Sequence, residues 1–150
     1  MKLQSTKTYG RFADKVMRTW IQIFRTFNKI RAKEMVYIKS FGLTMHQFTV
    51  LEVLYHRGDL TIGSITKLTM NTPGNITVVI RNLKRDGYIE SISDPKDKRV
   101  SLISITQKGK DVITELFPGH AKNFEEYFKS LSEEEIETLF TILRKLQKSQ

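Results

Sequence analysis

The sequence predicts a mainly α-helical chain with one small β-hairpin. Apolar residues recur every three or four positions through most of the 150 residues, which is the spacing of a buried helix face. Between residues 88 and 106 this spacing gives way to alternation and to β-branched residues, which are typical of strands. The length and the 39% hydrophobic content suit one domain with a true core, so we expect residues 1–150 to form a single unit.

The first expected helix covers residues 12–37. Its apolar stripe consists of Phe12, Val16, Trp20, Ile23, Phe27 and Ile30. No proline precedes Pro73, and Gly42 is the expected stop. A helix of roughly 25 residues is about 40 Å long and extends beyond the core of a small domain. We therefore expect it to pack against a second copy of itself.

Three shorter helices follow, and a threonine precedes each of them. The expected N-caps are Thr44, Thr61 and Thr72. Thr44 forms a capping-box motif with Gln47, and Pro73 stands at a first helical position, where its missing N–H has no cost. Gly58 and Gly87 are the expected C-terminal stops. The third of these helices therefore covers residues 72–86.

The hairpin covers residues 88–106 around a loop at residues 94–99, and the chain returns to helix at Gln107. Pro118 and Gly119 mark either a kink or a restart of that helix. Ser132 begins a second capping box, which opens the last helix. The apolar face of this helix consists of Ile136, Leu139, Phe140, Leu143 and Leu146.

The composition excludes several classes of function. Cysteine is absent, so no disulfide, thiolate metal site or thiol switch can form, and a cytoplasmic location fits this. His46, His56 and His120 are scattered and share no local cluster with carboxylates, so we expect no metal and no cofactor. Catalytic motifs and phosphate-binding glycine loops are absent, so we expect no enzyme. We also expect no membrane span and, at residues 1–9, no signal peptide.

The formal net charge of +9 makes a polyanion the first partner to test. Charge alone leaves open a nucleic acid, a membrane surface, an acidic protein or merely a soluble basic surface. Ten basic residues in the segment 1–40 and eight in the segment 81–110 flank a nearly neutral segment. We expect these two blocks to form one basic face.

The order of elements predicts a winged helix-turn-helix, with the helix at residues 72–86 as the recognition helix. Its inward positions are Ile76, Val79, Ile80 and Leu83. The opposite face is then free to approach base edges. The candidate DNA contacts on this helix are Thr72, Gly74, Asn75, Thr77, Val78, Arg81 and Arg85. A solvated face with incidental basic residues is the alternative.

The hairpin tip, or wing, gathers Lys96, Lys98 and Arg99 as further candidate DNA contacts. Arginine on a projecting ribbon suits a narrow minor groove, whose negative potential attracts it. Asp94 and Asp97 can orient the wing by holding a guanidinium through charge-assisted hydrogen bonds. A charged tip taken alone is more often a plain soluble turn. Its place directly after the recognition helix favours DNA contact.

With these motifs, the sequence resembles the MarR family of regulators from about Phe12 to Leu146. The resemblance rests on the segments 43–48, 83–89, 94–99 and 105–109. The wing departs from the family's usual pattern at Lys96, where arginine is common. Gly63 and Ser64 also lower the helicity of the short helix that precedes the recognition helix.

The resemblance implies a homodimer, with dimerisation helices at about residues 12–40 and 107–148 and a DNA-binding lobe at about residues 43–106. It implies a sequence-specific regulator, mostly a repressor, that places each recognition helix in the major groove of a pseudo-palindromic operator. Small, often aromatic ligands bind members between these two parts. Trp20, Phe24 and Tyr55 are the candidate liners of that crevice, although we expect a core position for each. The alternative is a winged-helix protein-interaction module with weak DNA binding.

Overall fold

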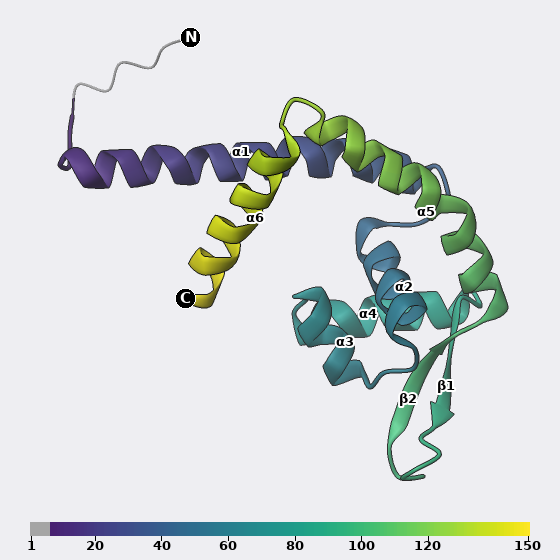
Figure 1. The fold of residues 1–150 in the computed structure, drawn as a ribbon. Helices are drawn as coiled ribbons and strands as arrows, with labels where there is room; N and C mark the ends of the chain where they lie inside the picture. Colours follow the sequence, from purple (N-terminus) through teal and green to yellow (C-terminus); the bar gives the residue numbers. More distant parts are fainter. Residues whose placement is uncertain (1–6) are drawn as a thin grey trace.

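A computed structural model describes residues 7–150 and confirms a mainly helical chain with one hairpin (Figure 1). Residues 1–6, which hold most of the segment assessed for a signal peptide, lie outside the described residues. The elements in chain order are α1 (Arg11–Lys39), α2 (Met45–Arg57), α3 (Ile62–Thr69), α4 (Pro73–Arg85), β1 (Ile89–Ser93), β2 (Ser101–Ile105), α5 (Gln107–Phe128) and α6 (Glu133–Lys148). None of the described helices is long and apolar enough to cross a membrane.

The predicted helix starts are confirmed by their hydrogen bonds. Thr44, Thr61 and Thr72 each accept a hydrogen bond from the backbone N–H three residues later. Both capping boxes are complete, because the side-chain oxygens of Gln47 and Glu135 accept a hydrogen bond from the backbone N–H of their N-cap residues. The helix ends also follow the expected glycines. The left-handed backbone at Gly58 and Gly87, with φ of 83° and 78°, closes α2 and α4.

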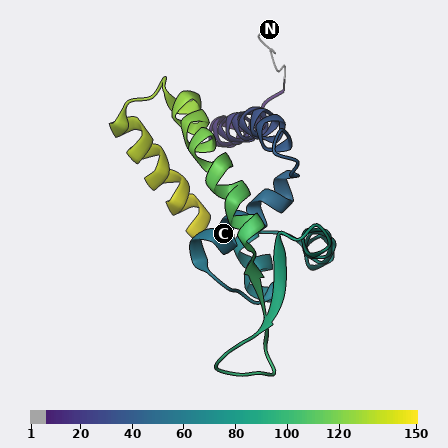
Figure 2. The same cartoon turned by 90° about the vertical axis from the view of Figure 1, so that its right-hand side faces the viewer.

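One core lies under the winged helix-turn-helix and extends to the C-terminal end of α1. Ile38 of α1, Leu51 of α2, Leu83 of α4, Ile103 of β2 and Leu116 of α5 are each at most 1% exposed. The hairpin strands are antiparallel, and β2 also exchanges two backbone hydrogen bonds with the turn that joins α2 to α3. Figure 2 shows the wing at one end of the molecule and α1 at the other.

Helix α5 continues through Pro118, so the alternative of a restart is wrong. The contact between α1 and α5 explains the glycine that follows the proline. The Tyr37 hydroxyl donates to the carbonyl of Leu116 at 2.8 Å, and a Cβ on Gly119 would lie 2.1 Å from that same hydroxyl oxygen. Only a residue without a side chain lets α1 approach α5 this closely.

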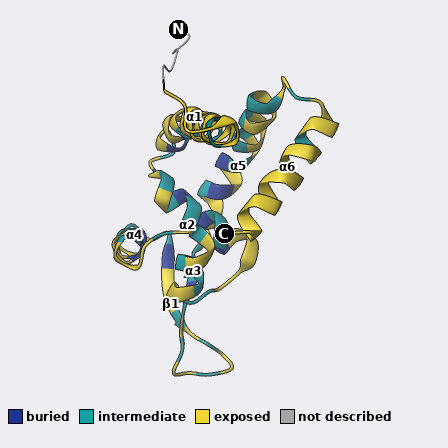
Figure 3. Cartoon of the chain, turned by 90° about the vertical axis from the view of Figure 1, so that its left-hand side faces the viewer, coloured by how far each residue is buried: buried dark blue, intermediate teal, exposed yellow. Residues whose placement is uncertain are grey.

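Most of the N-terminal part of α1 and nearly all of α6 are exposed (Figure 3). Helix α6 has no buried residue, although its predicted apolar face is present. The expectation of a core position is wrong for Trp20, Phe24 and Tyr55, whose exposed fractions are 61%, 56% and 41%. The apolar stripe of α1 was predicted correctly, but no other described part of the same chain packs against its N-terminal part.

Two glycines near the starts of helices should respond oppositely to alanine. A Cβ on Gly109 would lie 2.4 Å from the Tyr88 carbonyl oxygen, so we expect Gly109→Ala to lower the free energy of unfolding by about 1–3 kcal/mol. Nothing lies within 4 Å of a Cβ on Gly74, so we expect Gly74→Ala to raise it by up to about 1 kcal/mol. Urea denaturation measures both. Equal shifts for the two variants would contradict the close packing at Gly109.

Candidate nucleic-acid interface

Helix α4 has the two faces that the sequence predicts. Its four inward residues, Ile76, Val79, Ile80 and Leu83, are all buried in the core. Gly74, Thr77, Val78, Arg81 and Arg85 are all exposed on the other side, together with the N-cap Thr72. The exposed face begins with small and β-branched residues and ends with the two arginines. This order lets the N-terminal half of α4 come close to a base surface.

The side chain of Asn75 is held in place by the turn that joins α3 to α4. Its Nδ2 donates to Asn71 Oδ1 at 2.7 Å, and Asn71 Nδ2 in turn donates to Thr69 Oγ1 at 2.9 Å. Asn71 follows Met70, whose left-handed backbone ends α3. These bonds fix the amide of Asn75 and leave it one N–H and the carbonyl oxygen. Those are the groups with which asparagine reads adenine.

The two outward arginines differ in their surroundings. Arg85 is bound by the neighbouring Asp86, with its Nε 3.0 Å from Oδ1 and Nη2 3.3 Å from Oδ2. The hydrogen bond from this guanidinium holds the pKa of Asp86 below its ordinary value. The side chain of Arg81 makes no hydrogen bond or ion pair with any part of the chain that the structure describes. Arg81 is therefore the more available of the two for DNA.

The wing loop is ordered by its two aspartates, which have different partners. Asp97 accepts two bonds of 3.1 Å from Nε and Nη2 of Arg99, and its pKa lies below the ordinary value because of this guanidinium. The Arg99 side chain remains 91% exposed. Asp94 accepts instead from the backbone N–H of Lys96, at 2.8 Å. The prediction of a guanidinium held by carboxylate fits Asp97 but not Asp94, which shapes the backbone.

The base of the wing is bonded to the end of α4. The Thr106 hydroxyl donates to the Gly87 carbonyl at 2.6 Å, and Lys108 Nζ donates to the Asp86 carbonyl at 2.6 Å. The Lys108 ammonium also lies 4.4 Å from the centroid of the Tyr88 ring. These contacts join α4, the hairpin and α5 within a few residues. The end of α4 and the base of the wing are therefore bonded to each other.

A buried polar cluster, which we call the Glu34 joint, connects α1 to α5. Glu34 is 1% exposed, and its carboxylate accepts from His120 Nδ1 at 2.7 Å, Asn123 Nδ2 at 3.0 Å and Tyr127 Oη at 2.6 Å. Burial, followed by the hydrogen bond to Glu34, raises the pKa of Tyr127 to about 12. All three partners lie on α5, so one carboxylate fixes the angle between the two helices.

The sequence reading missed this joint. It considered only local clusters of histidines with carboxylates, and the contact between His120 and Glu34 spans 86 residues. One signal was present. Glu34 lies on the stripe of α1, four residues after Ile30 and four before the buried Ile38. A carboxylate at a stripe position needs buried partners, and α5 supplies them.

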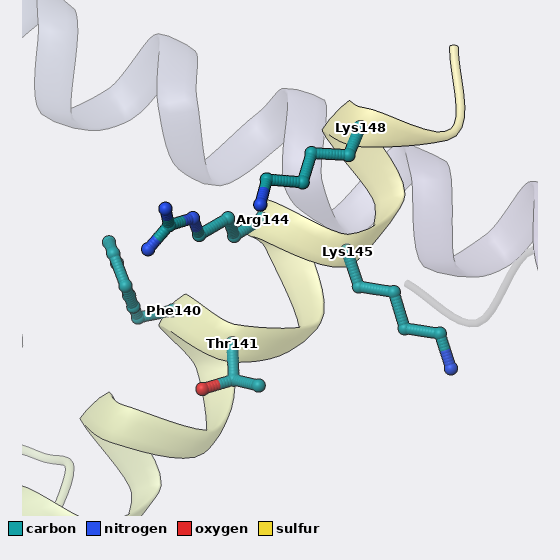
Figure 4. A pocket seen from close by; sticks show the side chains of 5 residues that line it. All are labelled: Phe140, Thr141, Arg144, Lys145 and Lys148. Carbon is teal, nitrogen blue, oxygen red and sulfur yellow. The ribbon is translucent and has the colours of Figure 1, made fainter.

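The aromatic residues predicted to line a ligand crevice are not gathered in one chain. The Trp20 and Phe24 rings lie 6.5 Å apart on the exposed part of α1. Tyr55 is on α2, and its hydroxyl lies 3.4 Å from the Thr114 hydroxyl of α5. The hollow in Figure 4 is lined by Phe140, Thr141, Arg144, Lys145 and Lys148, all from α6. A hollow lined by a single exposed helix does not enclose a ligand.

Metal binding has no support in the geometry. Within residues 7–150, no three histidine, aspartate or glutamate side chains come together in a way that could hold a metal ion. The Glu34 joint contains one carboxylate and one imidazole, and both bond within the protein.

Comparison with known proteins agrees with this geometry. A sequence profile described as "MarR family" matches residues 43–101. The HTH-type transcriptional regulator MhqR of Bacillus subtilis is 32% identical over 133 residues, which cover 89% of this chain and 92% of MhqR. YkoM, an uncharacterised HTH-type regulator of the same organism, is 31% identical over 88% of this chain and 86% of its own length.

Solved structures share the fold. BpsR of Bordetella bronchiseptica, whose DNA binding is described as regulated by 6-hydroxynicotinic acid, superimposes with a TM-score of 0.77 at 25% identity. The match covers 87% of this chain and 98% of BpsR. A mutant MarR from E. coli, solved in complex with operator DNA, superimposes with a TM-score of 0.79 at 22% identity, over 91% of this chain and 99% of that one.

Proposed function

This chain belongs to the MarR family of DNA-binding transcriptional regulators, and we propose that it is a homodimeric repressor of a pseudo-palindromic operator, relieved by a small ligand. Because the family consists of regulators, the chain is not an enzyme. The observation that carries the proposal is the exposed, partly unpaired polar face of α4 beside the ordered arginine of the wing. In this proposal residues 43–106 form the DNA-binding lobe, and residues 12–40 and 107–148 form the dimerisation helices.

In this arrangement α4 enters the major groove and the wing reaches the adjacent minor groove. Arg81 can donate two hydrogen bonds to a guanine, and Asn75 can pair with an adenine through its remaining amide groups. Arg99 enters the minor groove with its guanidinium already oriented by Asp97. Lys96 and Lys98 neutralise phosphates on either side of the wing. A second protomer repeats these contacts one helical turn away, which requires a pseudo-palindromic site.

A salt titration tests which residues read sequence. We expect Arg81→Ala or Asn75→Ala to cost about 1–3 kcal/mol on the specific site and little on random duplex. Lys96→Ala or Lys98→Ala should weaken both duplexes similarly and lower the salt slope by roughly 1 per lost phosphate contact. The DNA upstream of the protein's own coding region is the first specific probe. If the Arg81 and Asn75 variants weaken both duplexes equally, α4 positions the protein but does not read sequence.

The dimer is proposed from the apolar surface that one chain leaves uncovered. Phe12, Trp20 and Phe27 of α1 are 80%, 61% and 60% exposed, and Phe140 and Ile142 of α6 are each 58% exposed. Apolar patches of this extent mark an interaction surface. Both helices belong to the part of the chain outside the DNA-binding lobe. A second copy of this chain would cover them with matching surface.

Charges placed on this surface should separate the protomers. We expect the parent protein to sediment as a dimer at micromolar concentration without DNA, and Phe27→Glu to sediment as a monomer, because a buried unpaired carboxylate is costly at an apolar interface. Gln22→Glu is the matched control, since it adds the same charge to an exposed position on another face of α1 and should leave a dimer. A monomeric parent protein would exclude the proposed dimer.

The ligand site belongs to the dimer in this proposal. Trp20 and Phe24 of one protomer and Tyr55 of either protomer are the proposed aromatic liners, since exposed rings can stack on a flat ligand. The regulation of BpsR by 6-hydroxynicotinic acid, at 25% identity, supports an aromatic ligand here. A ligand between α1 and the lobe relieves repression if it changes the separation of the two recognition helices. Trp20 fluorescence during titration with such compounds tests this proposal.

A further inference from the structure

The positive charge of this protein lies mainly outside its DNA-binding lobe. Residues 43–106 carry eight basic and six acidic residues, whereas α1 carries eight basic and two acidic residues. The sequence reading expected the two basic segments to form one face, and this is wrong. The wing and α1 lie at opposite ends of the molecule in both views (Figures 1 and 2).

Five cations lie in a row along α1, interrupted by one uncharged residue, and we call them the α1 basic row. Its members are Arg11, Lys15, Arg18, Arg25 and Lys29, all of them exposed. At 100° per residue these positions fall within an arc of about 80°, and they extend over about 27 Å of helix. Glu34 and Ile38 are buried on the opposite side of α1, where it packs against α2 and α5, and they are rotated by roughly 140° and 180° from the centre of this arc. The row therefore faces away from α4 and the wing.

The charges of the row are not neutralised by ion pairs within the residues that the structure describes. None of its members makes an ion pair with residues 7–150. The nearest acid on the helix, Asp14, accepts hydrogen bonds from the Thr8 hydroxyl and the Tyr9 backbone N–H. The charge of Arg18 is the smallest of the influences that lower the pKa of Asp14. Gln22 is the one uncharged residue in the line of the row. A face of this kind keeps its positive potential and attracts a polyanion.

We propose that the α1 basic row is a second, sequence-independent DNA-binding surface, which holds another duplex segment while α4 and the wing hold the operator. The row is nearly as long as one turn of B-DNA, about 34 Å, so its cations can follow phosphates across one groove. This inference rests on the proposed function, because it assigns operator binding to the other end of the molecule.

The same geometry disfavours the other polyanions. A membrane-bound helix must bury its apolar face, and the apolar stripe of α1 lies on the side away from the row, where the proposed partner protomer covers it. An acidic protein partner would need an apolar anchor within the contact, and the line of the row contains none over its length. Duplex DNA needs only the cations, and DNA is already present at the operator.

A bridging assay tests the proposal. A bead-bound fragment of the DNA upstream of the coding region is first saturated with protein. The probe is a fluorescent random duplex of about 30 base pairs, which is longer than the single turn of DNA that one row spans. Its retention on the beads is measured at about 50 mM salt. We expect the parent dimer to retain the second duplex and to lose it steeply towards about 200 mM salt. The triple variant Arg18→Gln, Arg25→Gln, Lys29→Gln should retain at least about tenfold less.

The matched control removes three cations from α6 instead and should bridge the two duplexes as the parent does. Its substitutions are Arg144→Gln, Lys145→Gln and Lys148→Gln. Operator affinity and the thermal transition of the α1 variant should equal those of the parent. Bridging that survives the α1 variant, or is lost equally in the α6 variant, overturns the proposal. Absence of bridging by a parent protein that does bind the upstream fragment also overturns it. Failure of the parent to prefer that fragment over random DNA overturns the proposed function instead.

Discussion

Arg99→Ala should weaken operator binding by roughly a hundredfold or more, because charge-assisted hydrogen bonds are lost from both wings of a dimer. The fold should be unchanged. The Arg99 side chain is 91% exposed and bonds only to Asp97, so its removal opens no cavity and leaves no buried group without a partner. Electrophoretic mobility shift at physiological salt measures the affinity, and the thermal transition by circular dichroism measures the fold.

Asp97→Asn is the informative companion to this variant. It keeps Arg99 but removes the carboxylate that holds the guanidinium at 3.1 Å, so binding should weaken by less than in Arg99→Ala. Lys98→Ala controls for the loss of one positive charge at the tip. An Arg99→Ala protein that binds as tightly as the parent shows that the wing does not enter the minor groove. A lost thermal transition shows instead that the loop supports the fold.

The parts of the interface that sequence reasoning predicted are those set by near neighbours in the chain. An N-cap threonine, a proline at the first helical position and a glycine stop involve residues within one or two turns, so α4 and its buried face were predicted correctly. The Arg99 to Asp97 pair is local for the same reason. The fold class followed, because the order of these local elements admits few arrangements.

The parts that sequence reasoning missed depend on contacts between distant segments. The bonds of the Glu34 joint join residues 86 to 93 positions apart, and no local pattern gives that pairing. The direction in which the basic residues of α1 point also depends on how α1 packs on α2 and α5, which buries Glu34 and Ile38. A count of charges along the chain could not place that segment on the side away from the wing. The prediction of a core position for Trp20 and Phe24 was wrong because no other described part of the same chain covers them.

Removal of the Glu34 carboxylate should be the most destabilising single change outside the apolar core. Glu34→Ala leaves three buried or half-buried donors on α5 without an acceptor and opens space beneath α1. A buried donor left without an acceptor costs about 1–3 kcal/mol, so the loss of three such bonds should cost about 3–5 kcal/mol, a large share of the stability of a small domain. The matched control is Glu126→Ala on α5, whose carboxylate pairs with Lys129 at the surface and should change stability by under about 1 kcal/mol. Urea denaturation of both variants measures the difference.

The loss of stability at alkaline pH tests whether the Tyr127 hydroxyl takes part in the Glu34 joint. The pKa of Tyr127 is raised to about 12 in the folded protein, from 10.0 for an ordinary tyrosine, chiefly by burial and then by its bond to Glu34. A raised pKa contributes stability that is complete below the unfolded value and is lost as the pH rises towards the folded value. The parent should therefore lose stability between about pH 10 and pH 12, and Tyr127→Phe should lose less over this window. Tyr37, whose pKa burial also raises, accounts for part of the loss that persists in this variant. Parallel curves for the parent and Tyr127→Phe would mean that the hydroxyl is already ionised or solvated in the folded state, and the Glu34 joint would then lack its third bond.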